Sequence, residues 1–387
     1  MYAIKTYNKI SPVGLDLFDK TKYSVSDSTE APVGAIVRSA ALHEEVFPDT
    51  LLAIARAGAG TNNIPTERCS EEGVVVFNTP GANANAVKEL VLAGLFLASR
   101  KIAPAIEWAK TLKGSSDVGK IVEKGKSAFA GPEIYGKKLG VIGLGAIGVL
   151  VANAACELGM KVYGYDPYLS LKNAWELSHN VKQASDMKEI FAECDYITIH
   201  IPLNANTKGS INAEAFAMMK DGVRILNFAR DGLVNSDDML AALASGKVAS
   251  YVVDFPTEEM IGVEGVVCIP HLGASTPESE DNCAMMAVEE LMDYIENGNI
   301  TNSVNFPNVS LARGTSTRIC VIHRNIPNMI TSITFALAKD NVNIENMLNR
   351  SKGDYAYTML DVNECDKDAV AAHIKAVDGI IRVRIID

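Results

Sequence analysis

The pattern of hydrophobic and polar positions divides the chain into strand-like and helix-like segments. From about residue 33 to 78, short apolar runs alternate with polar turns, as in "GAIVRS", "LLAIARAG" and "VVVFNTP". Each run has the length of a strand and ends at a Gly, Ser or Pro loop. A helical pattern follows at 85–110 and is apolar on much of its circumference. It therefore predicts a long helix that is buried.

The central part of the chain repeats strand, turn and helix. Its apolar strands are evenly spaced and are separated by helical patterns: "KKLGVIGLG", "KVYGYDP", "CDYITIHIPL", "VRILNFAR", "ASYVVDF" and "VVCIPH". This alternation predicts an α/β fold in which helices cover both faces of a parallel sheet.

A separate tail follows a connector rich in Pro and Asn at 297–316. The pattern of the tail predicts a strand at 318–323, a helix at about 327–339, two strands within about 343–362, a helix at about 367–376 and a last strand at 380–386. This βαββαβ order is typical of a small ferredoxin-like domain.

Composition narrows the classes of function. A chain of 387 residues is long enough for two or three domains. Its net charge of −11 argues against a nucleic-acid-binding protein, which usually has a basic surface. Seven scattered cysteines without a C-x-x-C pair indicate a reducing compartment, no disulfide framework and no metal site. With no signal-like N-terminus and no long apolar run, we expect a cytoplasmic protein that does not contact membranes.

The stretch "VIGLGAIG" at 141–148 has the spacing of a dinucleotide-binding turn. Gly143 ends an apolar strand, and Gly145 and Gly148 open a helical pattern. Asp166 follows the next strand, where an acidic residue can accept hydrogen bonds from the adenosine ribose and repel a 2′-phosphate. The helix N-terminus would stabilise the diphosphate. The full context predicts a Rossmann-type domain that binds NAD in preference to NADP.

Polar residues follow three later strands of the same predicted sheet. Arg230 follows "NFA", Glu258 and Glu259 lie after "VVDF", and His271 comes after "VVCIP". An arginine grips a planar carboxylate, and a histidine takes a hydroxyl proton when a neighbouring carboxylate holds its imidazolium. Because parallel strands present their carboxyl ends at one edge, these residues predict hydride chemistry on a 2-hydroxy acid.

The chain resembles the D-2-hydroxyacid dehydrogenase family over nearly its whole length. The resemblance is carried by "VRSA", "RAGAGTNNIP", "NTPGANANAVKEL", "GKKLGVIGLGAIG", "YGYDPY", "HIPLNANTKGSIN", "NFARDGLVN", "VVDFPTEE", "PHLGASTPESE" and "NSVNFP". It implies a flavodoxin-like substrate domain (1–88 and 277–310), a Rossmann domain that binds NAD (89–276), and an active site between them.

Residue roles follow from the same resemblance. The catalytic residues would be Arg230, Glu259 and His271. The residues at the NAD site would be Gly143, Gly145, Ala146, Ile147, Gly148, Asp166, Ile201, Phe228, Ala229, Asp254, Gly273 and Ala274. The substrate site would be lined by Arg38, Ser39, Gly58 and Asn83. Arg38 and Lys126 are the candidates for a substrate phosphate, although Lys126 is equally well explained as a solvated loop charge.

The acidic loop and the substrate loop depart from the family pattern. Phe255 and Pro256 stand where the family usually has Val and Phe, and Met260 replaces the usual Pro after the catalytic Glu. Ala41 stands where a Thr is common. The shape of the acidic loop is therefore expected to differ, although its Glu is present.

The tail (317–387) resembles an ACT regulatory domain through "VIHRNIPNMI" and "DNVNIENML". Asn328 replaces a usual Gly, and Asn tolerates the left-handed conformation that such a turn needs. The resemblance implies an L-serine effector site with His323, Asn325 and Asn343. A tail used only for assembly is the alternative.

We expect NAD-dependent oxidation of 3-phospho-D-glycerate, a small-molecule substrate, by a homodimer or homotetramer. Two alternatives stay open. One is a reductase for glyoxylate, hydroxypyruvate or another 2-keto acid, and the other is a non-catalytic, NAD-sensing corepressor on the same scaffold.

Overall fold

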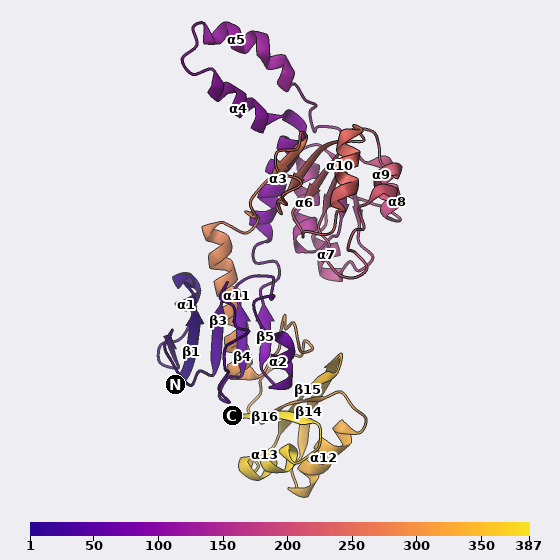
Figure 1. Ribbon diagram of the computed structural model, residues 1–387. Helices are drawn as coiled ribbons and strands as arrows, with labels where there is room; N and C mark the ends of the chain where they lie inside the picture. The colour runs from indigo at the N-terminus through magenta and orange to yellow at the C-terminus, as the bar shows by residue number, and fades with distance from the viewer. The chain divides into compact units, whose positions relative to one another are not determined.

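The computed structural model describes residues 1–387 (Figure 1), and the chain forms two compact units. The first unit contains Met1–Asn83 and Pro277–Asp387, and the second contains Ala84–Thr276. Each unit is built around its own parallel sheet, and each is described below by itself.

The sheet of the first unit has five parallel strands in the order β2-β1-β3-β4-β5. The strands are β1 (Tyr2–Tyr7), β2 (Tyr23–Ser26), β3 (Gly34–Val37), β4 (Ala53–Arg56) and β5 (Val75–Asn78), with short helices α1 (Pro12–Leu15) and α2 (Thr66–Glu71). The long helix α11 (Pro277–Asn297) returns from the far end of the chain and packs against this sheet. The pattern of hydrophobic residues did not predict β1, because only Ile4 of this strand is buried.

The tail forms a four-stranded antiparallel sheet in the order β14-β15-β13-β16. Its elements are β13 (Thr317–Arg324), α12 (Met329–Lys339), β14 (Ile344–Lys352), β15 (Tyr355–Val362), α13 (Lys367–Lys375) and β16 (Ile380–Ile386). The predicted βαββαβ order is confirmed. Asn328 caps α12 at φ +67°, so the asparagine does adopt the left-handed conformation that the turn requires.

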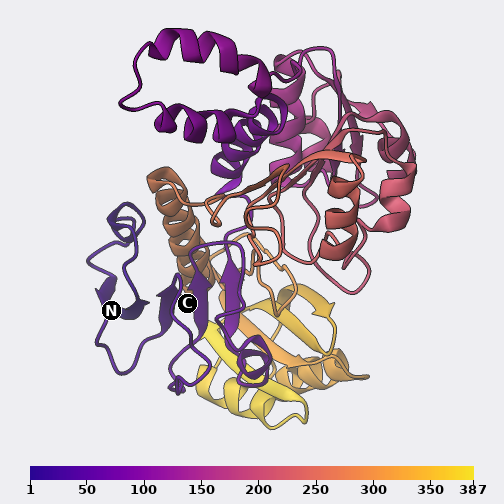
Figure 2. The same ribbon diagram turned by 45° about the horizontal axis from the view of Figure 1, so that its top comes forward.

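The two faces of the tail sheet pack against different partners. Both tail helices lie on one face (Figures 1 and 2), and side chains such as Ile319 and Leu360 pack against them. The alternate residues of the same strands, such as Ile322 and Tyr357, share a hydrophobic core with β4, β5 and α11. The tail and the first sheet therefore belong to one packed unit, and the assignment of 317–387 as a separate domain stays a prediction.

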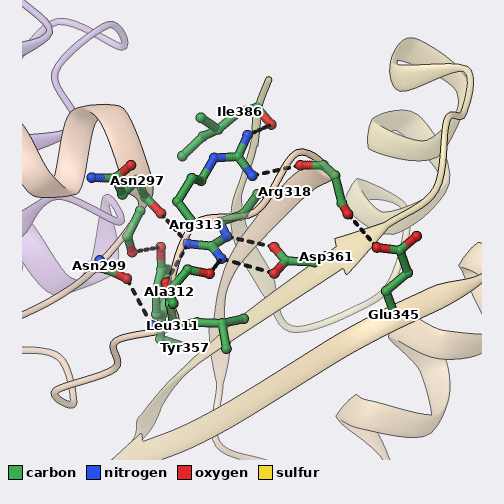
Figure 3. Close-up of polar contacts among 12 residues, drawn as sticks. Asn297, Asn299, Leu311, Ala312, Arg313, Arg318, Glu345, Tyr357, Asp361 and Ile386 are labelled. Atoms are coloured by element: carbon green, nitrogen blue, oxygen red, sulfur yellow. Dashed lines mark hydrogen bonds and ion pairs between the residues drawn. The ribbon is translucent and has the colours of Figure 1, made fainter.

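Hydrogen bonds also tie the tail to the end of α11 (Figure 3). The Arg318 guanidinium donates to the carbonyl oxygens of Asn297 and Leu311, at 2.9 Å each. The Tyr357 hydroxyl donates to the Gly298 carbonyl oxygen at 2.7 Å. The bonds to Asn297 and Gly298 satisfy carbonyl groups at the helix end, and the bond to Leu311 satisfies a carbonyl group of the connector.

The sheet of the second unit has seven parallel strands in the order β12-β11-β10-β9-β6-β7-β8. They are β6 (Lys138–Ile142), β7 (Lys161–Tyr165), β8 (Lys182–Gln183), β9 (Tyr196–Ile199), β10 (Val223–Asn227), β11 (Val248–Val253) and β12 (Val266–Cys268). One face packs against α3 (Ala84–Arg100) and α6 (Ala146–Glu157). The other packs against α8 (Met187–Glu193), α9 (Ala213–Met218) and α10 (Ser236–Ala244), while the short α7 (Leu171–Glu176) contacts α6. The prediction of a parallel sheet covered on both faces is confirmed.

The prediction of one long buried helix at 85–110 is wrong. The chain breaks at Lys101, which has φ +44°, between α3 and α4 (Ile102–Thr111). In a continuous helix Pro104 would clash with the carbonyl of Arg100 and would leave that carbonyl without its N–H partner. After the break, α4 has no buried residue. With α5 (Val118–Gly125) and the 3₁₀ turn η1 (Lys126–Phe129), it extends away from the sheet of this unit (Figure 1).

All seven cysteines are free, and no group of His, Cys, Asp and Glu side chains has the arrangement of a metal site. None of the helices combines the length and the apolar character needed to span a bilayer.

Candidate active site

The glycine turn after β6 has the conformation that its sequence predicts. Gly143 has φ +92°, and a Cβ there would lie 2.6 Å from the carbonyl oxygen of His200. A Cβ on Gly148 would lie 1.9 Å from the carbonyl oxygen of Gly143. Both positions therefore need glycine, because the turn packs its own backbone tightly between β6, β9 and α6.

Gly145 differs from its two neighbours because a Cβ on it would meet no atom within 4 Å. Its side-chain direction faces open space, directly before α6, whose N-terminus no side chain caps. Ala146 and Ile147 begin that helix. Free backbone N–H groups and the positive end of the helix dipole surround the space that a side chain would otherwise fill. These residues fit the diphosphate of a dinucleotide.

Asp166, at the end of β7, lies directly beside the turn. One carboxylate oxygen accepts a hydrogen bond from the Leu144 N–H and the other from the Tyr168 N–H, at 2.8 Å each. An ionised carboxylate has about four acceptor positions, so two remain for ribose hydroxyls. The structure therefore shows a local role for Asp166 that is compatible with the predicted one.

The turn lies at the point where the strand order reverses. From β6 the chain continues to β7 and β8 on one side, and it then crosses to β9 and the strands on the other side. Ligands of open parallel sheets bind at this position. Ile201 follows β9 next to Gly143. His200 borders the same turn, and burial lowers its pKa to about 4, so its imidazole is neutral there.

The turn after β10 presents Phe228, Ala229 and Arg230. The buried amide of Asn227 shapes this turn: its Nδ2 donates to the Arg230 carbonyl oxygen at 2.9 Å and its Oδ1 accepts from the Ala229 N–H at 3.2 Å. The Arg230 side chain is exposed and donates to the Ala229 carbonyl oxygen at 2.6 Å. Asn227 was not among the residues predicted for the site, although a polar residue at the end of a buried strand is the signal for such a role.

Asp254, at the end of β11, organises the segment that carries His271. Its buried carboxylate accepts from the backbone N–H groups of Leu272 and Gly273, at 2.8 and 2.9 Å. Burial raises the pKa of Asp254, and the two hydrogen bonds oppose that rise. The loop is held in a demanding shape, since His271 has φ +54°, a conformation that is rare for residues with a side chain. Ala274 follows directly.

His271 itself is exposed, and its ring contacts the ring of Phe255, with centroids 4.7 Å apart. Phe255 is one of the residues that depart from the family pattern. Glu259 lies in the loop after Phe255 with an exposed carboxylate, and no hydrogen bond joins it to His271. The Thr257 hydroxyl beside Glu259 lowers the pKa of that carboxyl group. The pairing of Glu259 with His271 stays a prediction.

Arg230, Glu259 and His271 follow β10, β11 and β12, which are neighbours in the sheet. The structure therefore brings all three residues to one edge, where the glycine turn after β6 also lies. This common edge is the main geometric support for the predicted catalytic set.

The predicted substrate residues Arg38, Ser39 and Gly58 lie after β3 and β4 of the first unit. The Arg38 guanidinium donates to Glu280 at 2.6 Å. Arg56, at the end of β4, was not singled out as a site residue; its Nε donates to the Arg38 carbonyl oxygen at 3.1 Å. Its guanidinium also lies over Gly58, where a Cβ would collide with it at 1.5 Å.

Asn83 and Lys126 are the other two residues predicted for the substrate site. Asn83 is the last residue of the first segment of unit one and makes no side-chain hydrogen bond. Lys126 lies on η1 of the second unit, and its ammonium is paired with Glu123 at 2.5 Å on the surface. That arrangement is what a solvated surface charge requires, and a role at a substrate phosphate stays a prediction.

Of the three candidate effector residues of the tail, His323 and Asn325 lie at the end of β13, and Asn343 lies apart from them in a single copy. Both ring nitrogens of His323 are occupied, by the Arg324 carbonyl oxygen at 2.8 Å and the Thr358 hydroxyl at 2.9 Å. Asn325 donates to the Gly353 carbonyl oxygen at the tip of the β14–β15 hairpin. Asn343 lies at the opposite end of the hairpin, where its N–H donates to Asn363.

Comparison with known proteins agrees with this arrangement. The profile of the D-isomer specific 2-hydroxyacid dehydrogenase NAD-binding domain matches residues 92–273. The D-3-phosphoglycerate dehydrogenase of Haemophilus influenzae is 32% identical over 348 residues, covering 87% of this chain and 81% of that protein. The chain belongs to the D-isomer specific 2-hydroxyacid dehydrogenase family. A D-3-phosphoglycerate dehydrogenase of Escherichia coli is equally similar, with 32% identity and coverage of 87% and 82%.

Solved structures of this dehydrogenase family have the same fold. The NAD⁺-bound 3-phosphoglycerate dehydrogenase of Entamoeba histolytica is 27% identical, with a TM-score of 0.60 over 79% of this chain and 98% of that chain. A D-mandelate dehydrogenase of Rhodotorula graminis, 21% identical, has a TM-score of 0.67 over 80% and 99%. About a fifth of this dehydrogenase therefore lies outside each match.

The protein is thus an NAD-dependent dehydrogenase whose Rossmann domain is the second unit. The bound nicotinamide supplies the hydride acceptor. Gly145 and the N-terminus of α6 would hold the diphosphate, and Asp166 would hold the ribose.

Proposed function

We propose that the dehydrogenase oxidises 3-phospho-D-glycerate at C2 to 3-phosphohydroxypyruvate, the first step of phosphorylated serine synthesis. The support is similarity to D-3-phosphoglycerate dehydrogenases over most of the chain, together with the three predicted catalytic residues at one sheet edge. A complete catalytic set argues against a corepressor. The structural neighbours include glyoxylate reductases at 23% identity or less, and that similarity concerns the fold alone.

Each residue of the set has a distinct task. Arg230, exposed and bonded only to a neighbouring carbonyl, is free to bind the substrate carboxylate with two parallel hydrogen bonds. The His271 imidazole accepts the proton of the C2 hydroxyl as the hydride leaves. Glu259 stabilises the imidazolium that results, by its negative charge.

Glu259 must approach His271 to perform this task. Catalytic hydrogen bonds are often long or absent before substrate binds, and they form in the complex. Met260 of the acidic loop is buried and anchors the loop in the hydrophobic core. The side chain of Glu259 is exposed, so it is free to change its rotamer. We propose that substrate binding brings the carboxylate to the ring.

The phosphate of the substrate is assigned to the loop ends of β3 and β4. Arg38 there is paired with Glu280, and both side chains are about half exposed, at 42% and 43%. An exposed ion pair contributes little free energy, typically less than about 1 kcal/mol. A doubly charged phosphate can therefore displace Glu280 from Arg38 at small cost.

The test of the reaction is an activity screen with phosphorylated and unphosphorylated 2-hydroxy acids. We expect 3-phosphoglycerate with NAD to give the highest kcat/KM, and NADP to give far less because Asp166 repels its 2′-phosphate. Arg38→Ala should weaken 3-phosphoglycerate much more than an unphosphorylated 2-hydroxy acid. Higher kcat/KM for glyoxylate or hydroxypyruvate reduction would favour the reductase alternative instead.

We propose further that L-serine binds between two copies of the tail. A site for zwitterionic serine needs a hydrogen-bonding group near each end of the ligand. In one copy of the tail, Asn325 and Asn343 lie at opposite ends of the hairpin. Two tails side by side in opposite directions would bring Asn325 of one copy near Asn343 of the other. His323, with both ring nitrogens occupied, would support Asn325 from within the sheet.

Titration of L-serine against the reaction rate tests the effector. Inhibition at millimolar serine that is lost in Asn343→Ala is the expected result, with a coupling of about 1–3 kcal/mol between the sites. Absence of both inhibition and binding by calorimetry would leave the tail as an assembly module.

A homodimer or homotetramer is proposed from the surface of α3, α4 and η1. Phe96, Ile102 and Ile106 are exposed there, at 40%, 38% and 51%, and they line one groove with Phe129. Large exposed apolar side chains that share a groove mark an interface. Light scattering should give at least a dimer, and Ile106→Glu should yield monomers.

We also propose a cytoplasmic location. All seven cysteines are unpaired in the fold, which suits a reducing compartment. Fractionation of cells that express the tagged full chain tests this.

A further inference from the structure

A polar cavity of about 490 Å³, widely open to solvent, lies on the first unit, and none of the residues assigned above to the substrate, the cofactor or the effector lines it. One wall is formed by β14 of the tail and contains Arg350 and Lys352. The other wall is formed by the segment after α11, with Ser303 and Asn308, and by Asn78 at the end of β5. The tail and the first sheet therefore meet around this space.

The cavity is positively charged in a protein whose net charge is −11. Arg350 and Lys352 are two residues apart on one strand, so their side chains lie on the same face of it. No aspartate or glutamate lines the cavity. The charges of both cations are therefore not neutralised by the cavity itself.

The two cations have spare donors. The Arg350 guanidinium makes no hydrogen bond and no ion pair in the structure, although it has five N–H groups. The Lys352 ammonium donates one bond, to the Ser303 carbonyl oxygen at 3.0 Å, and this places it at the cavity wall. Partial burial lowers the pKa of Lys352, a cost that a bound anion would offset.

The opposite wall is preformed by backbone and side-chain contacts. The Asn78 N–H donates to the Asn302 carbonyl oxygen at 3.3 Å, and the Asn302 amide donates to Glu290 at 2.7 Å. Phe306 packs edge-on against Tyr355 of the tail, with ring centroids 5.7 Å apart. The amide of Asn308 is exposed and makes no hydrogen bond. This wall offers polar groups without adding charge.

We propose that this cavity binds a small anion that bears a phosphate group. A guanidinium matches phosphate oxygens with a planar pair of donors, and a neighbouring ammonium adds a point charge. The volume lies within the range of small-molecule sites. Arg350 and Lys352 hold the phosphate, and the amides of the opposite wall contact the rest of the ligand. The assignment does not depend on the identity of the substrate.

The test is calorimetric titration of the full chain with glycerol 3-phosphate, a phosphate ester that has no carboxylate. We expect binding that weakens at least about tenfold in Arg350→Gln/Lys352→Gln, which corresponds to about 1.4 kcal/mol or more. The control Lys375→Gln removes an exposed positive charge from the end of α13 and should leave binding unchanged. Thermal melts of the variants check that each is folded.

A second control separates this cavity from the catalytic site. Arg38→Ala should keep the binding event that the double variant loses, because Arg38 is not among the residues that line the cavity. Three results would each overturn the proposal. The first is loss of this binding event in Arg38→Ala, and the second is full binding in the double variant. The third is no binding to the wild type when glycerol 3-phosphate is in tenfold molar excess over protein at millimolar concentration. Competition against glycerol 3-phosphate shows which ligand the cavity prefers. If inorganic phosphate displaces it equally well, the site binds the free ion. If 3-phosphoglycerate displaces it more strongly, the site binds a phosphorylated acid.

Discussion

Arg318 and Asp361 form a two-point ion pair inside the joint between the tail and the rest of its unit. The guanidinium donates from Nε to one carboxylate oxygen at 2.7 Å and from a terminal nitrogen to the other at 3.0 Å (Figure 3). Arg318 is fully buried, and its remaining N–H groups donate to carbonyl oxygens of Asn297, Leu311 and Ala312. Every N–H group of the guanidinium is thus bonded and each Asp361 oxygen accepts a bond, so the paired charges are buried at a reduced cost.

Loss of one partner of this pair should destabilise the protein strongly. Arg318→Ala leaves the Asp361 carboxylate buried without its cation and leaves three carbonyl groups without a donor. We expect a loss of about 3–5 kcal/mol in the free energy of unfolding of the first unit, measured by urea denaturation.

A double variant separates the charge effect from packing. Arg318→Met with Asp361→Leu removes both charges together, so it should lose much less than either single variant. A double variant as unstable as Arg318→Ala would show that the bonds to the connector carbonyls, and not the ion pair, hold the joint.

The sequence allowed the elements of this joint to be predicted, but not the pair itself. The strand, helix and turn patterns of the tail are local, so hydrophobic spacing and turn residues reveal them. Arg318 and Asp361 are separated by 43 positions, and the local sequence around either residue does not indicate which residue is its partner. The hydrophobic core that the tail shares with the first sheet could not be predicted either. It depends on which face of the tail sheet packs against another element, and the local sequence does not determine this.

The candidate site shows the same division. The glycine turn and the three strand ends were predictable because parallel strands present their carboxyl ends together. The contact of Phe255 with His271 and the support of the His271 loop by Asp254 arise from loop conformation, which spacing does not determine. The broken helix at Lys101 could have been predicted from Pro104, whose clash with Arg100 is a local effect.

The three glycines of the turn should respond differently to the addition of one methyl group. Gly145→Ala places its Cβ in open space, so the free energy of unfolding should change by less than about 1 kcal/mol, the scale of substitutions at a helix N-cap. The same methyl occupies the approach of the diphosphate, so the Kd for NAD should rise at least about tenfold.

Gly148→Ala is the matched comparison for that variant. Its Cβ would collide with the Gly143 carbonyl oxygen, so the second unit should be destabilised whether or not NAD is present. Thermal melts with and without NAD measure both effects. Equal NAD affinity in Gly145→Ala and the wild type would place the diphosphate elsewhere.

Replacement of His271 should affect turnover and spare cofactor binding. His271→Ala removes the proposed general base, and kcat should fall by about 10²-fold or more. The Kd for NAD, followed by fluorescence, should change little, since the glycine turn is untouched. His373→Ala is the control, because this exposed histidine pairs with Asp340 in the tail. Normal turnover in His271→Ala would remove His271 from the mechanism.

Glu290 should make the stability of the first unit depend on pH. This carboxyl group is buried in α11, one oxygen accepts from Asn302 and the other has no partner. Burial raises the pKa of Glu290 from 4.5 to about 8. Between these values the unfolded chain loses the proton while the folded chain keeps it. The stabilising contribution of the protonated carboxyl group is therefore complete below the pKa of the unfolded chain. It is lost as the pH rises through the pKa of the folded chain.

The slope of this loss is at most about 1.4 kcal/mol per pH unit for one proton. Urea denaturation at pH 5, 7 and 9 should show that Glu290→Gln, which stays neutral, gains stability over the wild type as the pH rises. Glu71→Gln, which removes an exposed glutamate on α2 of the same unit, should follow the wild type at every pH. Parallel curves for Glu290→Gln and the wild type would mean that Glu290 is ionised in the folded protein at neutral pH and finds compensation that the fold does not reveal.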